Sequence, residues 1–229
     1  LSERVLFPAM PAEAAGMEDA RFVRFTDDDG SVTFYATYTA YSGSKIRQQL
    51  LETRDFRSFV STPMVGIAAA NKGLALFPRR IGGRFAALSR SDRESNSIAY
   101  SDRPFVWTSA VPCQQPVEAW EALQLGNCGS PIETEAGWLV LTHGVGPMRT
   151  YRIGAILLDL DDPTRIIGRL REPLLSPADD EQNGYVPNVV YSCGAMVHAD
   201  TLVLPYGIGD AAIGLAAVSL PLLLDALVR

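Results

Sequence analysis

The stretch ALFPRRIGGRFAAL, residues 75–88, decides the fold. It begins with a short apolar segment, 75–77, turns at Gly82-Gly83 and continues as a second segment over 84–88. Glycine takes positive φ without a steric penalty, so two consecutive glycines between apolar segments favour a tight β-hairpin. The stretch therefore predicts two antiparallel strands.

The same layout occurs four times along the chain. Each copy has an apolar strand, a turn, an alternating strand, a further strand and a polar loop, and the copies start near positions 20, 75, 130 and 188. A repeat of roughly 50 residues made of short strands indicates a β-propeller with about one four-stranded blade per repeat. A β-sandwich would have a similar strand content, and the fourth strand of each repeat is not resolved by pattern alone.

Composition places the chain among soluble globular proteins. It has 229 residues, 47% of them hydrophobic and 20% charged, and we expect one catalytic domain over 1–229. The net charge of −6 gives no global attraction to nucleic acid or to an anionic membrane. No run of eighteen apolar residues occurs. Residues 211–228 are the stretch most similar to such a run, and their pattern indicates a buried strand followed by a short helix.

The cysteines predict free thiols. Cys113, Cys128 and Cys193 are too few and too scattered for a disulfide framework, and two histidines add no zinc ligand set. We therefore expect no metal and no cofactor, and free thiols favour the cytoplasm. The chain starts at Leu1 rather than at methionine, which suggests that it begins within a longer protein.

An acidic pair, Glu18-Asp19, precedes the apolar alternation of the first repeat. Neighbouring residues of a strand face opposite ways, so only one of the two carboxylates can face a substrate. By position alone, both fit a solvated turn as well as a catalytic site.

Basic side chains flank the hairpin of residues 75–88. Lys72 and Arg90 lie at its opposite ends, so both can reach one face of a propeller and hold an oxyanion. Arg80 is an alternative to Arg90. His143 lies at the end of an apolar strand, where a lone histidine is usually a packed side chain. Gly144 beside it favours a binding role, because glycine lets the backbone approach a ligand closely.

Two more carboxylates are candidates for binding a sugar. Glu181 lies in an acidic loop, and Asp210 follows Gly207-Ile208-Gly209. Solvated surface is the simpler interpretation of both. Carboxylates near aromatic side chains are nevertheless common in sugar sites, where they accept hydrogen bonds from hydroxyls.

Taken together, the sequence motifs of this chain resemble those of family 130 of the glycoside hydrolases, the mannoside phosphorylases and β-1,2-mannosidases. The similar stretches are GMEDAR (16–21), TYTAY (37–41), LFPRRIGGRF (76–85), PIETEAGWL (131–139), HGV (143–145), GAILLDLDDP (154–163), NVV (188–190) and YGIGD (206–210). They stand in the family's order over nearly the whole chain. One departure is Ala20, where the family has proline, and it affects turn rigidity more than chemistry.

The resemblance implies an all-β fold, a five-bladed β-propeller with its site on the central axis. Only about four blades are present in the sequence, so we expect most of the first blade to be missing from this chain. That blade contributes an arginine to the family's site.

The resemblance also implies the reaction. Asp19 matches the proton donor, which acts through a hydroxyl of the mannose. Lys72, Arg90 and His143 match the residues that bind phosphate, the co-substrate whose attack with inversion releases α-mannose 1-phosphate.

Glu181 and Asp210 match the carboxylates that hold the sugar. The expected partners are a β-mannoside oligosaccharide and phosphate, without nucleic acid or membrane, and a homo-oligomer is compatible with the sequence. Two alternatives stay open: an inverting β-1,2-mannosidase that uses water, and a non-catalytic carbohydrate-binding propeller.

Overall fold

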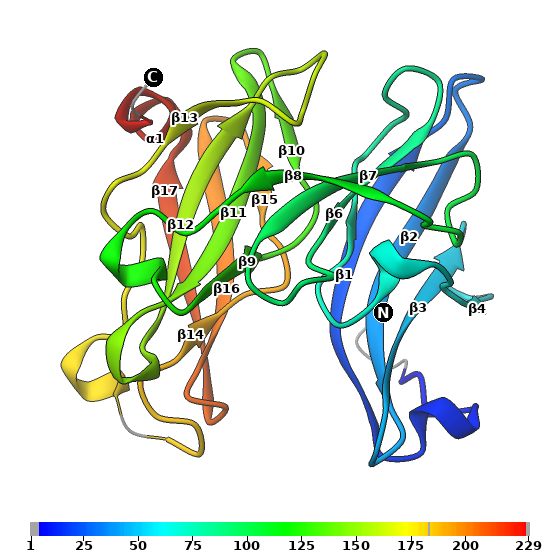
Figure 1. Ribbon diagram of the computed structural model, residues 1–229, viewed down its shortest axis with the longest axis horizontal. Coiled ribbons are helices and arrows are strands. Elements are labelled where there is room, and N and C mark those ends of the chain that lie inside the picture. The colour runs from blue at the N-terminus through cyan, green and yellow to red at the C-terminus, as the bar shows by residue number, and fades with distance from the viewer. Residues whose placement is uncertain (1–4, 183, 228–229) are drawn as a thin grey trace.

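Four antiparallel β-sheets, one for each predicted repeat, form the blades of a β-propeller in the computed structural model (Figure 1). The structure describes residues 5–182 and 184–227. Leu1, where the sequence suggests an internal start, lies outside the described residues. The all-β prediction is confirmed.

The strands follow one another blade by blade along the chain. Blade one contains β1 (Gly16–Thr26), β2 (Val32–Tyr41), β3 (Ile46–Thr53) and β4 (Val60–Pro63). Blade two contains β5 (Ala75–Leu76), β6 (Phe85–Ser89), β7 (Asn96–Ser101) and β8 (Ala110–Gln114). Blade three contains β9 (Gln124–Asn127), β10 (Ile132–Thr134), β11 (Gly137–Val145), β12 (Tyr151–Leu158) and β13 (Ile166–Arg169). Blade four contains β14 (Val190–Tyr191), β15 (Met196–His198), β16 (Thr201–Ile208) and β17 (Ala212–Ser219).

The first strand is broken in the last two blades. In blade three both β9 and β10 pair with β11, and in blade four both β14 and β15 pair with β16. Each half is too short to show the period-2 alternation by which strands are recognised. This is why the repeats look weaker toward the end of the sequence.

Helix is scarce, as the sequence predicts. The described residues include one α-helix, α1 (Leu220–Ala226), and short 3-10 turns at η1 (Pro11–Glu13), η2 (Ile67–Ala69), η3 (Ala119–Glu121), η4 (Pro147–Arg149) and η5 (Asp179–Glu181). No helix in the described part of the chain is long and apolar enough to cross a membrane.

The turn at Gly82-Gly83 has the predicted geometry. Both glycines have positive φ, 56° and 75°, and Ile81 pairs with Arg84 across them. Two positive φ angles define the type I′ turn, which matches the twist of the flanking strands.

The core lies between successive blades, because each sheet buries one face against the next. Blades one and two share a cluster that includes Val23, Phe25, Leu76, Phe85 and Trp107. Blades two and three share Phe77, Leu88, Ile98, Trp138 and Ile156. Blades three and four share Leu139, Leu141, Ile153, Leu202 and Leu204.

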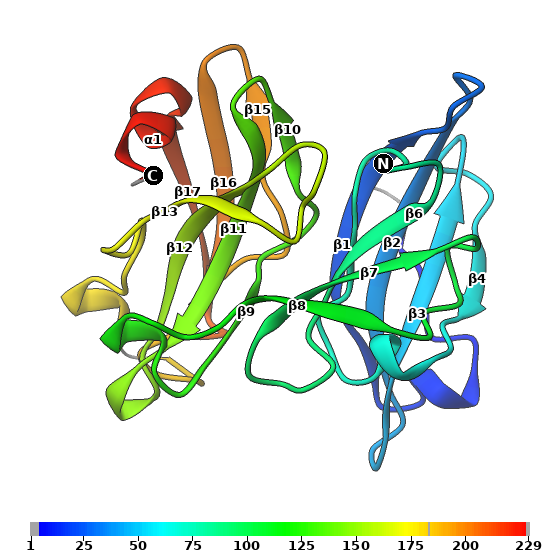
Figure 2. The ribbon, with the colours of Figure 1, turned by 45° about the horizontal axis from the view of Figure 1, so that its top comes forward.

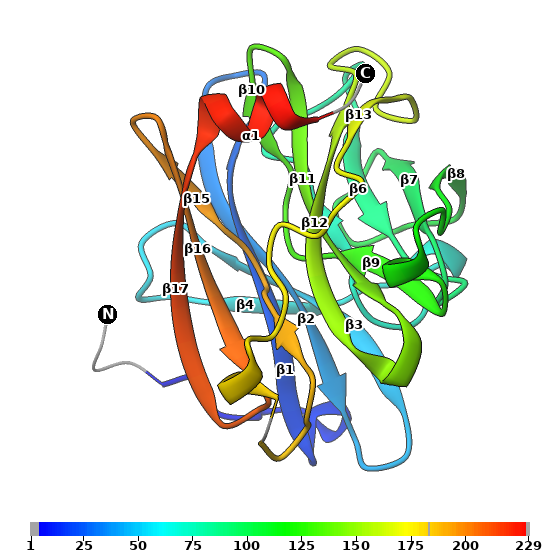
Figure 3. The ribbon, with the colours of Figure 1, turned by 90° about the vertical axis from the view of Figure 1, so that its left-hand side faces the viewer.

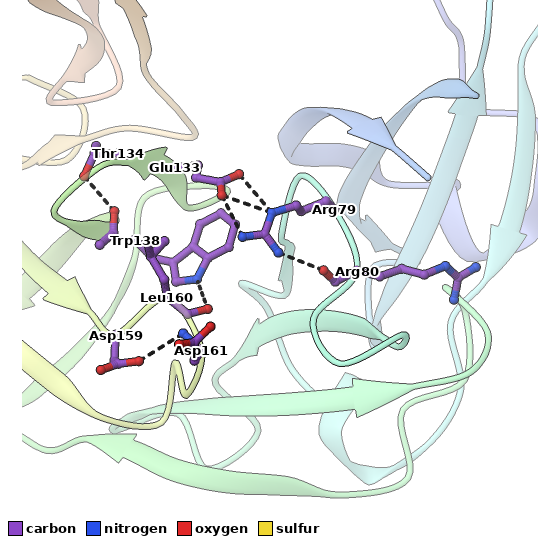
Figure 4. A network of polar contacts seen from close by, with 9 residues as sticks. Arg79, Arg80, Glu133, Thr134, Trp138, Asp159, Leu160 and Asp161 are labelled. Atoms are coloured by element: carbon purple, nitrogen blue, oxygen red, sulfur yellow. Dashed lines mark hydrogen bonds and ion pairs between the residues drawn. The ribbon is translucent and has the colours of Figure 1, made fainter. Parts of the chain in front are cut away.

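A salt bridge between Arg79, which follows β5, and Glu133 of β10 joins blades two and three (Figure 4). The Arg79 Nε–H is shared between both oxygens of the Glu133 carboxylate at 3.0 Å, and Nη2 donates to Oε1 at 2.6 Å. Its guanidinium also lies 4.8 Å from the centre of the Trp138 ring. Arg80 pairs with Asp27 and so joins blades two and one in the same way.

The last strand differs from its prediction. A strand followed by a helix is confirmed by β17 and α1, but the expectation that this strand is buried is wrong. Ile213 and Leu215 of β17 are 86% and 71% exposed. The reason is position: β17 is the outermost strand of blade four, and no described strand covers its outer face (Figure 3).

Candidate active site

Asp19 lies on a β-bulge in β1. The pairing of β1 with β2 shifts register between Glu18 and Arg21, and Asp19 has φ 57°. A left-handed backbone in a residue other than glycine costs about 1–3 kcal/mol and is concentrated at functional sites. A bulge re-aims the side chain of the residue it contains. The first strand of blade one is therefore distorted at its predicted acid.

The neighbouring carboxylates of Glu18 and Asp19 have different partners. Glu18 accepts a hydrogen bond from the Lys72 ammonium. Burial, and to a smaller extent the nearby Asp19 carboxylate, raises the pKa of the Cys193 thiol to about 11, so Asp19 lies beside a protonated thiol. The two acids are thus separated, as expected for adjacent strand residues.

Arg90 and His143 form a pair between blades two and three. Arg90 Nη1 lies 2.8 Å from His143 Nε2. A guanidinium can only donate, so Nε2 accepts and the ring proton is on Nδ1. A Cβ on Gly126 would lie 2.5 Å from His143 Cε1 and 2.8 Å from Arg90 Nη1, so only glycine leaves room for this pair.

His143 is a neutral, buried side chain. It is 2% exposed, and burial lowers its pKa well below the ordinary 6.5, with further lowering by the charges of Arg90 and Arg21. Because the imidazole is neutral, the Arg90–His143 pair carries the single positive charge of the guanidinium. An anion is the complementary ligand.

The buried imidazole predicts a pH dependence of stability. His143 is protonated in the unfolded chain below about pH 6.5 but not in the folded protein, so the unfolded state binds more protons there. The contribution of His143 to the free energy of unfolding is therefore fully present above pH 7. Below pH 6.5 the free energy of unfolding falls by up to about 1.4 kcal/mol per pH unit. Urea unfolding between pH 5 and 8 measures this slope.

The matched variants are His143→Gln and His198→Gln. His198 ends β15 and is exposed, so its replacement is expected to leave the slope unchanged, while His143→Gln flattens it between pH 5 and 6.5. Equal slopes in all three proteins would show that His143 is accessible to protons in the folded state.

Lys72 and Arg90 lie on the same side of blade two. Asn127 Nδ2 donates to the carbonyl oxygen of Gly73 at 2.6 Å, and a Cβ on Gly73 would lie 3.9 Å from Arg90 Cβ. The structure thus brings the residue after Lys72 against Arg90. Arg80, the alternative, pairs with Asp27 at the other end of the strands.

Glu181 and Asp210 lie on loops of blade four. Glu181 accepts a hydrogen bond from Tyr206 Oη at 3.2 Å. Asp210 has φ 53° and lines the same cavities as Tyr191, whose ring centre is 5.1 Å from that of His143. The structure therefore places Asp210 near the tyrosine that contacts His143, and it joins Glu181 to Tyr206.

A cavity of about 380 Å³ opens beside His143. Its lining combines apolar side chains, such as Met148 and Val186, with polar and aromatic ones that suit a sugar: Arg149, Tyr151, Asn188, Tyr191 and Asp210. Three of them, Arg149, Asn188 and Asp210, have left-handed backbone. Concentrated strain of this kind is typical of a binding site.

Sequence reasoning missed Arg21, Tyr191 and Cys193. Arg21 is 1% exposed, and its Nη2 donates to Tyr191 Oη at 2.6 Å. The missed signal is its position: Arg21 precedes Val23 and Phe25 on the core-facing side of β1, where a charged residue is rare without a specific role.

This arrangement can bind an oxyanion and supply a proton. Lys72 and Arg90 provide the positive charge, and Asp19 provides a carboxyl group whose backbone is held on a bulge. In the described part of the chain no group of three or more histidine, cysteine or acidic residues could hold a metal ion.

The chain is similar to known mannoside phosphorylases. It is 34% identical over 224 residues to the 1,2-β-oligomannan phosphorylase of Thermoanaerobacter sp. (strain X514), covering 96% of this chain and 74% of the relative. It is 34% identical over 218 residues to the β-1,2-mannobiose phosphorylase of Listeria innocua, covering 90% of this chain and 58% of the relative. The chain thus spans between about half and three quarters of the length of these relatives.

Solved structures and a family model agree with these similarities. The β-1,2-mannobiose phosphorylase of Listeria innocua, solved with β-1,2-mannobiose, superposes with a TM-score of 0.85 at 31% identity and covers 97% of this chain and 63% of the other. The glycoside hydrolase family 130 model, described as β-1,4-mannooligosaccharide phosphorylase, matches residues 1–229. The chain therefore belongs to family 130 of the glycoside hydrolases.

Proposed function

We propose that the protein cleaves β-mannosides by phosphorolysis with inversion and releases α-mannose 1-phosphate. The observation that carries this proposal is the pair of Arg90 with a buried, neutral His143, next to the segment of Lys72. A hydrolase needs no site for an oxyanion, whereas a phosphorylase does. The relatives' names, phosphorylases of β-1,2- and β-1,4-linked mannosides, support the same reaction.

In this proposal, phosphate is bound by Lys72, Arg90 and His143. One Arg90 N–H is engaged by His143, so the other guanidinium N–H groups are free to donate to phosphate oxygens. Lys72 adds a second positive charge, and its ammonium also forms an ion pair with Glu18. The neutral imidazole adds no charge but fixes the guanidinium in place, which preorganises the site for the anion.

Bond breaking falls to phosphate and Asp19. A phosphate oxygen attacks the anomeric carbon of mannose while the bond from that carbon to the leaving oxygen breaks. Asp19 gives up its proton, through a mannose hydroxyl, to the leaving oxygen. An acid and a separate nucleophile on opposite faces of the sugar lead to inversion.

Sugar binding falls to Glu181 and Asp210 together with the tyrosines of the 380 Å³ cavity. Carboxylates accept hydrogen bonds from hydroxyls, and the rings of Tyr151 and Tyr191 can cover an apolar sugar face. This division leaves Asp19 for the chemical step.

A fifth blade is proposed for the complete enzyme. A groove of about 650 Å³ separates blade one from blade four, and its lining is mainly apolar, with Phe22 on one side and Met196, Ile213 and Leu215 on the other. In Figure 2 the two blades lie on opposite sides of the molecule's centre. A further blade packed here would cover the outer face of β17 as each described blade covers its neighbour.

Ile213→Asp tests the fifth blade. If another blade covers β17, the full-length enzyme is expected to lose about 2–4 kcal/mol in the free energy of unfolding, because a buried isoleucine is replaced by a charge. Val117→Asp is the control, since Val117 is 67% exposed on a loop away from the groove. Urea unfolding in which both variants lose under about 0.5 kcal/mol would contradict the covered face.

The reaction is tested by phosphate dependence. Full-length enzyme is incubated with β-1,2- and β-1,4-mannobiose, with and without phosphate, and products are identified by phosphorus and proton NMR. We expect α-mannose 1-phosphate only with phosphate, and its loss in His143→Ala. Free mannose formed at the same rate in both conditions would show a hydrolase, and binding without any cleavage would show a carbohydrate-binding propeller.

A further inference from the structure

Arg21 is a buried cation whose charge no carboxylate neutralises in an ion pair among the described residues. Its side chain is 1% exposed, and its Nε has no hydrogen-bond partner. Burying a charge costs several kcal/mol unless other groups compensate for it. A charge kept at this cost in the first strand of a blade calls for an explanation in its contacts.

The contacts of Arg21 lead to Asp19. Arg21 Nη1 donates to the main-chain carbonyl oxygen of Asp19, two residues earlier, at 3.1 Å. This bond closes over the bulge in which Asp19 has its left-handed φ. It therefore holds the strained backbone that sets the direction of the Asp19 side chain.

Arg21 is itself fixed by Tyr191. Its Nη2 donates to Tyr191 Oη at 2.6 Å, which joins blade one to blade four. Two N–H groups of one planar guanidinium are thus anchored at once, a geometry that a lysine ammonium cannot reproduce. The ring of Tyr191 lies 5.1 Å from that of His143, so this contact also fixes Asp19 relative to the phosphate side of the site.

We propose that Arg21 is a positioning residue for the catalytic acid: held by Tyr191, it keeps Asp19 in its left-handed bulge and aimed at the substrate. The proposal rests on the proposed function for the role of Asp19. It predicts that Arg21 acts on proton donation and not on phosphate binding.

The first test is kinetic, on full-length enzyme. Arg21→Lys keeps the charge but loses the two-point contact, and we expect kcat for β-mannobiose to fall about 10- to 100-fold with the KM for phosphate nearly unchanged. Tyr191→Phe removes only the acceptor of Nη2 and should lower kcat in the same direction by less. Arg24→Lys is the matched control, because Arg24 is an exposed residue of β1 whose Nη1 donates to Thr26 Oγ1 at 3.1 Å.

A second substrate separates positioning from general damage. A dinitrophenyl β-mannoside has a leaving group that needs little protonation, so Arg21→Lys should lose only a few-fold in rate on it. The double variant with Asp19→Asn should be no slower on mannobiose than Asp19→Asn alone. Equal losses on both substrates, or a further loss in the double variant, would overturn the proposal.

A crystal structure of Arg21→Lys gives a readout independent of activity. We expect Asp19 to leave the left-handed region and its carboxylate to move away from Cys193. An Asp19 that keeps its φ and its contact would overturn the positioning role whether or not the enzyme cleaves mannosides. Absence of any phosphate-dependent cleavage by the wild-type enzyme, in contrast, would overturn the proposed function and leave this structural result to decide Arg21.

Discussion

Asp19→Asn is expected to lower kcat for β-mannobiose phosphorolysis by about 10²- to 10⁴-fold, the usual contribution of a general acid. Asparagine has the shape of aspartic acid but cannot give up a proton to the leaving oxygen. Substrate and phosphate still bind, since neither Lys72 nor Arg90 pairs with Asp19. The KM values should therefore change little.

The loss should also depend on the leaving group. Phosphorolysis of a dinitrophenyl β-mannoside should fall far less, because its leaving oxygen needs no proton. Asp28→Asn is the matched control, an exposed aspartate in the turn after β1. An Asp19→Asn enzyme within a few-fold of wild type on mannobiose would exclude Asp19 as the acid.

Arg90→Gln is expected to raise the KM for phosphate about 10- to 100-fold while the KM for β-mannobiose stays close to that of wild type. Hydrogen bonds to a charged group contribute about 1.5–3 kcal/mol, which corresponds to this range. Glutamine also loses the charge that accompanies His143, so the anion loses both a donor and an electrostatic attraction.

Arg80→Gln is the control for Arg90→Gln. Both arginines belong to blade two, but Arg80 pairs with Asp27 and covers the Phe85 ring at 4.1 Å, at the other end of the first strands. Its replacement should reduce stability slightly and leave the KM for phosphate unchanged. Initial rates over a range of phosphate concentrations decide this, and a phosphate effect confined to Arg80→Gln would reverse the assignment.

Local chemistry made the strands and turns predictable. The turn at Gly82-Gly83 needs positive φ at both positions, which glycine alone takes freely, and the register around it follows. The repeat of about 50 residues indicated sheets of about four strands because each copy carries the same order of strands and turns. These features depend on contacts close in sequence.

The exposure of β17 could not be predicted from the sequence. Ile213 and Leu215 read as core because apolar side chains are usually buried, but burial depends on what lies opposite. That neighbour belongs to the arrangement of blades in space and leaves no trace in the local pattern of β17.

The sequence by itself determined an all-β repeat fold, and its resemblance to family 130 singled out Asp19, Lys72, Arg90 and His143. The tertiary structure alone decided which of these side chains meet. Arg90 joins His143 across 53 positions and Arg21 joins Tyr191 across 170, because the propeller brings strands of different blades together around one axis. The charge, burial and backbone strain at these contacts depend on distances that sequence spacing does not encode. The position of Arg21 in β1 could have indicated burial, but its contacts with Asp19 and Tyr191 became visible only in the folded chain.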